Sequence, residues 1–244
     1  MSTQNKIALI TGANKGIGFE TALKLGQQGI TVYIGSRDSN RGNAAVEKLR
    51  NTGIDARFIH IDLGDLVTVD KAAAQLSNEH GHLDILINNA GIMSTEDGSP
   101  LTTDLGVVKE TFETNFYGAL YVSQKMVPLL EKSLAARIVN VSSGLGSLAL
   151  NQDPSWEFAD AKLIGYNASK AALNMLTVQL AWAFKETGIK VNSANPNYTN
   201  TELLPDTTGG RPVEDAARVI IRLALLAEDG PTGGFFEDDF SLPW

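Results

Sequence analysis

Between Ile7 and Glu20 the chain reads IALITGANKGIGFE. The first four residues of this segment are apolar and predict a buried strand. Gly12, Gly16 and Gly18 follow, and glycine is needed where the backbone turns tightly or comes close to another group. Glycines are common in ordinary turns as well, but these lie directly between a predicted strand and a predicted helix, whose N-terminus favours a phosphate. The segment therefore predicts a strand–turn–helix unit that binds a nucleotide.

Short apolar runs and longer amphipathic stretches alternate along the rest of the chain. After residues 7–10, the predicted strands cover residues 31–34, 57–61, 85–87, 138–141 and 190–194, with a short final strand at 234–236. The predicted helices cover residues 16–28, 41–50, 66–78, 103–130, 166–187 and 213–226. The apolar runs are continuous rather than alternating, which is typical of strands covered on both faces. The pattern predicts an α/β fold, a doubly wound parallel sheet of the Rossmann type with helices on both faces.

Composition narrows the class of protein. The chain has 244 residues, of which 20 are basic and 28 acidic, and its formal net charge is −8. This acidic balance disfavours a nucleic acid or an anionic membrane as partner, because such surfaces attract a basic patch. There is no cysteine, which excludes disulfides, thiolate metal sites and cysteine nucleophiles and suits a reducing compartment. No apolar stretch is long enough to span a membrane and the start is polar, so we expect a soluble, cytoplasmic protein.

Two further features bear on organisation and on metals. No linker or change of composition divides residues 1–244, so we expect a single domain. His60 falls on a predicted strand, whereas His80 and His82 flank Gly81 in a loop, so the histidines are not expected to converge on a metal ion.

The end of the second predicted strand bears on the choice of cofactor. It reads Gly35-Ser36-Arg37-Asp38. A carboxylate at this place binds the ribose 2′-hydroxyl of NAD, whereas an arginine accommodates the 2′-phosphate of NADP. Arg37, together with the charge of Lys15 in the glycine turn, favours NADP over NAD. Asp38 keeps NAD open, and a solvated surface pair is the alternative interpretation.

Three motifs occur in order along nearly the whole chain. They are TGANKGIGFE at residues 11–20, Asn88-Asn89-Ala90-Gly91 after the fourth predicted strand, and Tyr166-Asn167-Ala168-Ser169-Lys170 at the start of a helix. With them the sequence resembles the short-chain dehydrogenase/reductase superfamily, and specifically its carbonyl reductase-like branch. The resemblance implies one NAD(P)-binding catalytic domain. Its implied activity is NADP-dependent, reversible reduction of a ketone or aldehyde to the alcohol by hydride transfer.

The resemblance also implies four catalytic residues. Tyr166 protonates the carbonyl oxygen, and Lys170, four residues later on the same helix face, lowers the pKa of the phenol together with the positive nicotinamide ring. Ser143 donates a hydrogen bond to the substrate carbonyl, although its neighbour Ser142 is an alternative. Asn115 holds a water that links the lysine to solvent. For Asn115 the other interpretation is a local helix irregularity without catalytic consequence.

The cofactor-binding residues that the resemblance implies are Gly12, Asn14, Lys15, Gly16, Ile17, Gly18, Arg37, Asp62, Leu63, Asn89, Ala90, Gly91, Tyr166, Lys170, Pro196, Asn197, Thr199 and Thr201. Asp62 is expected at the adenine amino group, and Asn89 and Gly91 at the adenosine ribose. The family usually has Pro-Gly where this chain has Pro196-Asn197. Asparagine tolerates positive φ, so the turn is expected to survive, but a side chain now projects there and puts nicotinamide placement in question.

Several segments bear on the substrate. Residues 144–165, with Trp156 and Phe158, are expected to form an apolar wall for a bulky ketone or aldehyde, or else an added surface helix. The candidates for lining the site are Met93, Tyr198, Leu203 and Leu204, with ordinary loop packing as the alternative. The acidic run Glu237-Asp238-Asp239 is expected to be solvated. Residues 240–244 are expected at the pocket mouth or against a subunit.

Alternative functions also fit parts of the sequence. A dinucleotide-sensing regulatory protein has this fold without catalysis, but it does not require a proton donor. A nucleotide-sugar epimerase shares the Tyr/Lys pair, yet 244 residues leave little room for its larger C-terminal domain. The expected partner is a small-molecule carbonyl or alcohol, and the protein is expected to be a monomer or a homo-oligomer.

Overall fold

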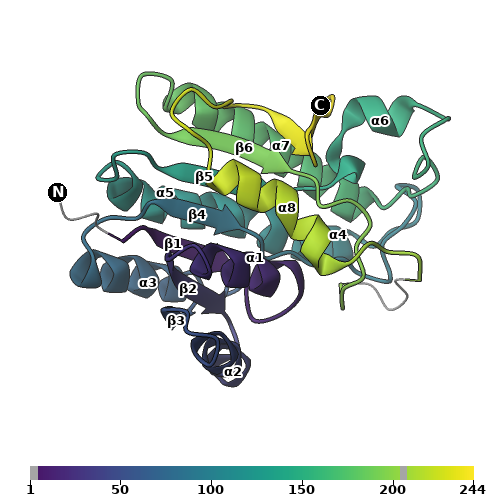
Figure 1. Cartoon of the computed structure of the whole chain (residues 1–244). Coiled ribbons are helices and arrows are strands. Elements are labelled where there is room, and N and C mark those ends of the chain that lie inside the picture. The colour runs from purple at the N-terminus through teal and green to yellow at the C-terminus, as the bar shows by residue number, and fades with distance from the viewer. Residues whose placement is uncertain (1–4, 204–207) are drawn as a thin grey trace.

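The computed structural model describes residues 5–203 and 208–244 (Figure 1). The strands in this part of the chain are β1 (Ile7–Thr11), β2 (Thr31–Ser36), β3 (Ala56–His60), β4 (Ile85–Asn88), β5 (Arg137–Val141), β6 (Lys190–Ala194), β7 (Phe235–Glu237) and β8 (Phe240–Ser241). They form one sheet in the order β3-β2-β1-β4-β5-β6-β7-β8. Each pair from β3 to β7 is parallel, and β8 pairs antiparallel with β7. The predicted doubly wound parallel sheet is confirmed, with the two-residue β8 as an unpredicted addition.

The helices also follow the predicted alternation. Those described are α1 (Gly16–Gly26), α2 (Ser39–Arg50), α3 (Leu66–Glu79), α4 (Leu105–Phe112), the π-helix η1 (Glu113–Gly118), α5 (Ala119–Leu130), the 3₁₀-helix η2 (Gly144–Gly146), α6 (Leu148–Gln152), α7 (Ile164–Ala183) and α8 (Val213–Ala224). The helix predicted over residues 103–130 is confirmed from Leu105 to Leu130, but its middle, η1, is a π-helix that separates α4 from α5. Such π turns often mark functional sites.

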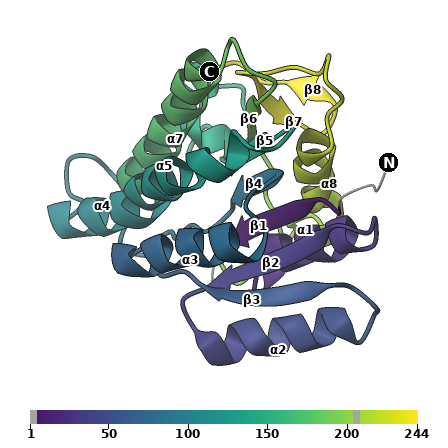
Figure 2. The ribbon, with the colours of Figure 1, turned by 90° about the vertical axis from the view of Figure 1, so that its left-hand side faces the viewer.

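Helices cover the sheet on both faces, as Figure 2 shows. One buried apolar cluster joins the strands to α1, α2 and α8, and a second joins them to α3, α5 and α7. Both faces of the strands are therefore buried, which explains their continuous apolar runs. The crossover direction changes between β1 and β4, so the segments that follow these two strands meet at the carboxyl edge of the sheet, where ligands bind in folds of this type.

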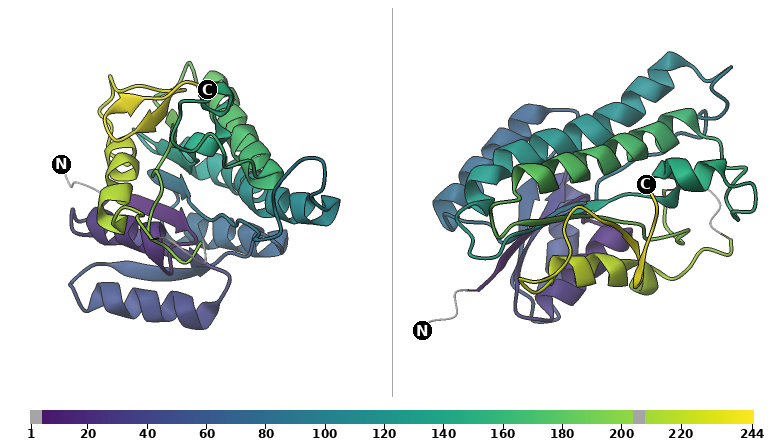
Figure 3. Two further views of the ribbon diagram at one scale, coloured as in Figure 1. Left: turned by 90° about the vertical axis from the view of Figure 1, so that its right-hand side faces the viewer. Right: turned by 90° about the horizontal axis from the view of Figure 1, so that it is seen from above.

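The C-terminal segment packs back onto the chain itself. The backbone N–H of Ala149 donates to the Trp244 carbonyl oxygen (3.0 Å), and Ser147 Oγ donates to the Pro243 carbonyl oxygen (2.8 Å). The Trp244 ring stacks on Phe235 with centroids 5.5 Å apart. Figure 3 shows the C-terminus beside α6. The last residues therefore cover the chain's own sheet edge.

No helix in residues 5–203 or 208–244 combines the length and apolar character that crossing a bilayer requires.

Candidate active site

The glycine turn after β1 packs directly against the end of β4. Gly12 has φ +64° and Gly16 has φ +57°, a region that favours glycine. A Cβ on Gly12 would lie 2.9 Å from the Ala90 Cα, and one on Gly18 would lie 2.5 Å from Asn89 Nδ2. Side chains at Gly12 and Gly18 would therefore collide with the segment after β4. The structure brings these predicted cofactor residues together, with Asn14 and Ile17 half-buried in the same turn.

Hydrogen bonds hold the two segments in register. Thr11 Oγ1 accepts from the backbone N–H groups of Asn89 and Ala90, each at 3.0 Å. Asn89 Nδ2 donates in return to the carbonyl oxygens of Thr11 (2.9 Å) and Gly12 (3.2 Å). The amide of Asn89 thus serves the glycine turn itself, which stiffens the turn where the backbone must approach a ligand.

The N-terminus of α1 fits a phosphate group. Lys15 is its N-cap residue, with an extended backbone and no side-chain cap on the helix. Because no side chain of the described residues caps the first N–H groups of α1, these groups suit an anion. These residues therefore fit the pyrophosphate of a dinucleotide. Lys15 Nζ itself lies 2.5 Å from Glu202 Oε2 in the loop after β6, an exposed ion pair that the sequence did not predict.

Arg37 and Asp38, at the end of β2, make different contacts. Asp38 caps α2, because its Oδ1 accepts from the backbone N–H groups of Asn40 (2.9 Å) and Arg41 (3.0 Å). The bond from Arg41 is the largest effect that lowers the pKa of this carboxyl. Arg37 is exposed, and its carbonyl oxygen lies 3.1 Å from His60 Nε2. The carboxylate is thus committed to a helix terminus, whereas the guanidinium faces solvent.

Asp62 and Leu63 follow β3. Asp62 Oδ1 accepts from the backbone N–H of Gly64 (2.9 Å), and the backbone N–H of Asp62 donates to Thr68 Oγ1 (2.8 Å). Leu63 packs on η1, since a Cβ on Gly118 would lie 2.8 Å from the Leu63 side chain. The segment after β3 is therefore joined to the π turn.

Asn115 lies within η1 and is 1% exposed. Its Oδ1 accepts from the backbone N–H of Ile92 (2.8 Å), and its Nδ2 donates to the Ile92 carbonyl oxygen (2.9 Å) and to Ser169 Oγ (3.0 Å). A Cβ on Gly91 would lie 3.4 Å from both Asn115 Oδ1 and Lys170 Nζ. Asn115 therefore lies both in the irregular part of the helix and at the predicted site, because η1 directs its amide toward the segment after β4.

Tyr166 and Lys170 are buried side by side on α7, with exposed fractions of 7% and 4%. Lys170 Nζ lies 5.6 Å from the centroid of the Tyr166 ring and donates to the Val141 carbonyl oxygen at 2.8 Å. Burial lowers the pKa of Lys170 to about 8. It also raises the pKa of Tyr166 to about 12, against a hydrogen bond with Ser143 that lowers it. In the protein without cofactor, burial outweighs the effect of Ser143 on this pKa, and the lowering expected beside a positive nicotinamide ring stays a prediction.

The two serines after β5 face different groups. Ser143 lowers the pKa of the Tyr166 phenol, and its Oγ accepts from the backbone N–H of Leu145 (3.2 Å). Ser142 is 2% exposed, and its Oγ lies 3.4 Å from the Lys170 carbonyl oxygen. Ser143 is thus the serine that shares the surroundings of the phenol.

Asp97 is a site residue that the sequence did not predict. Its carboxylate, 9% exposed, accepts from the backbone N–H groups of Gly98 (2.9 Å), Gly165 (3.0 Å) and Tyr166 (2.7 Å). Leu163, the N-cap residue of α7, provides no side-chain cap, so Asp97 caps this helix from a distant loop. No local pattern indicates such a cap, because the partners lie 68 and 69 residues apart.

The loop after β6 keeps the turn predicted for Asn197, whose φ is +58°. The Asn197 side chain turns toward β7, where its Nδ2 donates to Glu237 Oε1 at 2.7 Å. Thr199 Oγ1 lies 3.1 Å from the Pro196 carbonyl oxygen and 2.9 Å from that of Asn197. Thr201 lies near the glycine turn, 3.6 Å from the place of a Cβ on Gly16. Leu204, a predicted lining residue, lies outside the described residues.

Aromatic rings line the segment between η2 and α7. Trp156 packs on Phe158 with centroids 5.5 Å apart, and Phe158 lies 6.2 Å from the Tyr198 ring. A Cβ on Gly144, next to Ser143, would lie 2.9 Å from the Trp156 ring. Within residues 144–165, α6 has no buried residue, as expected of an added surface helix. Trp156 lies close to the serine segment, and a wall for a substrate stays a prediction. Met93 is half-buried and Leu203 is 39% exposed.

The acidic run near the C-terminus does not form a solvated tail. Glu237 binds the loop after β6, and Asp238 Oδ1 lies 2.7 Å from Arg211 Nη2. Asp239, at 90% side-chain exposure, alone fits the prediction. The prediction is wrong for the other two because β8 folds the run back over the sheet edge.

Comparison with known proteins agrees with this architecture. The family model described as short chain dehydrogenase matches residues 6–211. The chain is 31% identical to (−)-isopiperitenone reductase of Mentha piperita, over 99% of each protein, and 30% identical to carbonyl reductase [NADPH] 1 of Mus musculus, over 100% of each. It superposes on NADPH bound carbonyl reductase from chicken fatty liver with a TM-score of 0.84 and 26% identity, covering 99% of this chain and 100% of that one. The chain therefore belongs to the short chain dehydrogenase family.

Proposed function

We propose that this protein is an NADP-dependent reductase that converts a ketone or aldehyde reversibly to the alcohol, with Tyr166 as proton donor. One observation carries the proposal: a buried phenol lies next to a buried lysine, whose Nζ is 5.6 Å from the centre of the phenol ring and donates to the Val141 carbonyl oxygen where β5 ends. A regulatory dinucleotide sensor does not require this arrangement. We further propose that residues 1–244 act as one catalytic domain, which the single continuous sheet supports.

The proposed cofactor site lies at the carboxyl edge of the sheet, where the uncapped α1 receives the pyrophosphate. The residues that we propose for it are Gly12, Asn14, Lys15, Gly16, Ile17, Gly18, Arg37, Asp62, Leu63, Asn89, Ala90, Gly91, Tyr166, Lys170, Pro196, Asn197, Thr199 and Thr201. When bound, NADPH supplies a hydride to the carbonyl carbon. NADP is favoured over NAD because Arg37 is exposed, whereas Asp38 is held by α2. The NADPH in the names of a relative and a structural neighbour supports the same choice.

Side chains of the protein itself hold the proton and donate it to the substrate. With a pKa of about 12, Tyr166 holds its proton at neutral pH and can donate it to the carbonyl oxygen. Ser143, which lowers the pKa of the same phenol, can donate to the carbonyl oxygen as negative charge develops there. Lys170, with a pKa of about 8, is mostly charged at neutral pH, and its ammonium then stabilises the phenolate that remains.

We propose that Asn115 completes the site from η1 by maintaining a path for protons to Lys170. The position of Gly91 supports this role, because Gly91 borders both the Asn115 amide and the Lys170 ammonium. The proton that Tyr166 loses must be replaced before the next turnover, and a buried lysine needs such a path.

The substrate that we propose is a bulky apolar ketone or aldehyde. The rings of Trp156, Phe158 and Tyr198 support it, because apolar walls with few polar anchors suit such molecules. The names of two relatives, an isopiperitenone reductase and a carbonyl reductase, support a carbonyl compound as substrate. We propose a cytoplasmic enzyme, which the cysteine-free composition suits, acting as a monomer or homo-oligomer.

The test is NADPH oxidation over ketones and aldehydes of increasing size, with Trp156→Ala as a comparison. We expect turnover with wild-type protein and a larger loss of kcat/KM for bulky than for small substrates in Trp156→Ala. Tight NADPH binding without turnover of any carbonyl would overturn the proposal in favour of a sensor. Unchanged selectivity in Trp156→Ala would contradict the proposal that the aromatic rings form a wall for the substrate.

A further inference from the structure

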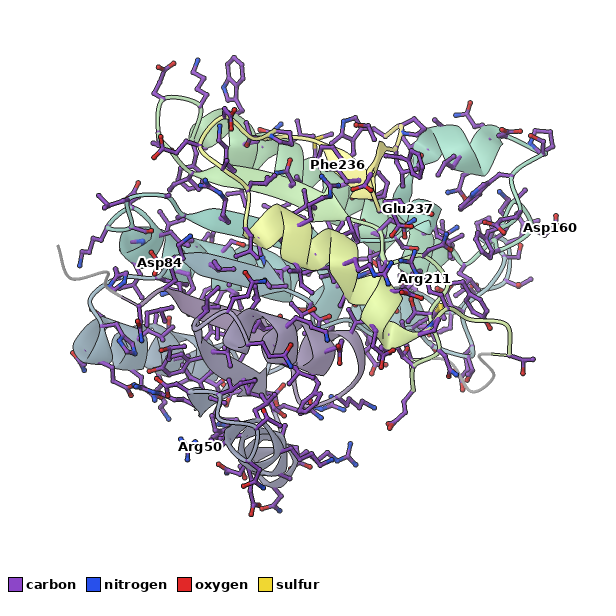
Figure 4. All side chains as sticks on the ribbon, in the orientation of Figure 1. Arg50, Asp84, Asp160, Arg211, Phe236 and Glu237 are labelled. Atoms are coloured by element: carbon purple, nitrogen blue, oxygen red, sulfur yellow. The ribbon has the colours of Figure 1, made fainter. Side chains whose placement is uncertain are left out.

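Asn197 occupies the position where family resemblance implies glycine. Its φ of +58° is one that asparagine tolerates better than most residues, so the backbone does not require glycine. The side chain, however, must be accommodated. Its Nδ2 donates to Glu237 Oε1 at 2.7 Å, which directs the amide toward the C-terminal hairpin of β7 and β8. Figure 4 labels Glu237 on this hairpin.

The same carboxylate binds a second amide. Glu237 Oε2 accepts from Asn195 Nδ2 at 2.5 Å, and Asn195 Oδ1 accepts from the backbone N–H of Asn197 at 3.1 Å. Asn195, Asn197 and Glu237 therefore form a closed ring of hydrogen bonds, in which the one carboxylate accepts from both side-chain amides. Hydrogen bonds to a charged acceptor are stronger than those between neutral groups, and Asn195 is only 5% exposed. The ring thus holds the start of the loop firmly to β7.

The next residue of the hairpin holds the far end of the loop. Asp238 Oδ1 and Oδ2 accept from Arg211 Nη2 (2.7 Å) and Nη1 (3.2 Å). The backbone N–H of Arg211 donates in turn to the Tyr198 carbonyl oxygen (2.9 Å). Adjacent acidic residues on one hairpin therefore bind the two ends of the segment between Asn195 and Arg211.

The ring also borders the proposed catalytic groups. Asn195 Nδ2, which Glu237 binds, lies 3.3 Å from the place of a Cβ on Gly144, the residue after Ser143. Further along the loop, Thr201 lies against the glycine turn. A shift of this loop would therefore move groups at both the serine segment and the phosphate-binding turn.

We propose that Glu237 is a positioning residue whose carboxylate holds the amides of Asn195 and Asn197 against β7, so that a side chain can occupy the glycine position of the nicotinamide loop. The role of this loop in binding the nicotinamide cofactor rests on the proposed function. The clamp itself is a property of the chain and can be tested without catalysis.

The test compares wild type with Glu237→Ala, Glu237→Gln, Asn197→Gly and the Glu237→Ala/Asn197→Gly double variant. Asp239→Asn is the matched control, because it removes a charge from the same hairpin at a side chain that is 90% exposed. Hydrogen exchange of residues 195–203 is measured in protein without cofactor. The dissociation constant for NADPH, and kcat and KM for a reducible ketone, are measured separately.

We expect Glu237→Ala to accelerate exchange in residues 195–203 and to raise the NADPH dissociation constant about tenfold, with a smaller effect on kcat. Glu237→Gln keeps the shape but only one acceptor oxygen, so it should lie between wild type and Glu237→Ala, and it remains informative if the alanine variant folds poorly. Asp239→Asn should resemble wild type, whereas Asn197→Gly removes one of the two amides that Glu237 binds and should accelerate exchange less than Glu237→Ala does. In the Asn197→Gly background, Glu237→Ala should accelerate exchange and raise the NADPH dissociation constant clearly less than it does in the wild-type background.

Unchanged exchange in both Glu237 variants, or an equal cost of Glu237→Ala in the two backgrounds, would overturn the clamp. Faster exchange together with no ketone turnover by wild type would support the clamp and overturn the reductase function. The two proposals therefore fail in different measurements.

Discussion

The backbone N–H of Tyr166 donates to the carboxylate of Asp97 at 2.7 Å, although 69 residues separate them. The same carboxylate accepts from Gly165, so the first turn of α7 is held by a loop that follows β4. A carboxylate at a helix N-terminus satisfies N–H groups that the helix itself cannot. The place of the proposed proton donor therefore depends on a residue that takes no part in the chemistry.

Asp97→Ala should lower both stability and turnover. Loss of a buried, charged acceptor is expected to cost about 1–3 kcal/mol, which lowers the Tm by roughly 2–4 °C per kcal/mol in a chain of this length. The released first turn should also reduce kcat, because small displacements of a catalytic group are costly. Thermal unfolding and NADPH oxidation measure the two effects. Asp104→Ala, which removes the cap that Gly106 N–H uses on α4, is the control and should leave kcat nearly unchanged. Equal kcat in both variants would contradict a positioning role for Asp97.

Tyr166→Phe should abolish turnover while leaving cofactor affinity nearly intact. The ring and its packing remain, and only the acidic hydroxyl is lost, so kcat should fall by about two to four orders of magnitude. The kcat of NADPH oxidation and the NADPH dissociation constant are the measurements. Tyr121→Phe removes a hydroxyl that bonds Asp70 at 3.0 Å and should behave like wild type. Substantial residual turnover in Tyr166→Phe would remove its assignment as proton donor.

The buried lysine predicts a pH dependence of activity. The pKa of Lys170 is lowered to about 8 by burial, whereas that of Tyr166 is raised to about 12. As the pH rises through about 8, the ammonium loses its charge while the phenol keeps its proton, so kcat/KM for NADPH should fall with one ionisation near 8. Lys170→Arg should move this fall to higher pH, since guanidinium stays charged. A fall at the same pH in an active Lys170→Arg variant would assign it to another group.

Stability should change in the opposite direction over this range. The folded pKa of Lys170 lies below its ordinary value of 10.5, so the unfolded chain binds the proton more tightly between about 8 and 10.5. The free energy of unfolding that depends on Lys170 should therefore increase with pH in that window. Denaturant titrations of wild type and Lys170→Met at pH 7 and 9 provide the measurement. The difference in unfolding free energy between the two proteins should change between these pH values, and a constant difference would speak against a perturbed lysine.

Arg37→Asp should weaken NADPH more than NADH. The guanidinium is exposed and suits a dianionic phosphate, whereas a carboxylate repels it. We expect the NADPH dissociation constant to rise roughly tenfold or more, with NADH affected about threefold at most. Lys48→Asp makes the same charge change at an exposed site on α2 and should leave the preference unaltered. An unaltered preference in Arg37→Asp would place the 2′-phosphate elsewhere.

Most of the fold follows from local patterns. The strands β1 to β6 lie within two residues of their predicted bounds, because continuous apolar runs can be buried only between two layers of helices. The helix predicted over residues 103–130 did not reveal the π-helix η1, where Asn115 binds Ile92, because 3.6-residue periodicity carries no sign of a contact between distant segments. The two-residue β8 is too short for any periodic signal.

The amino-acid order alone determined the glycine turn, the strand and helix alternation and the spacing of Tyr166 and Lys170, since each depends on residues within one or two helical turns. Tertiary contacts determined the rest. Asp97 reaches Tyr166 across 69 residues, and Glu237 reaches Asn197 across 40. Burial then set the pKa of the phenol against its neighbours. Desolvation and the pairing of distant polar groups depend on what surrounds a side chain in three dimensions, and no local pattern specifies those surroundings.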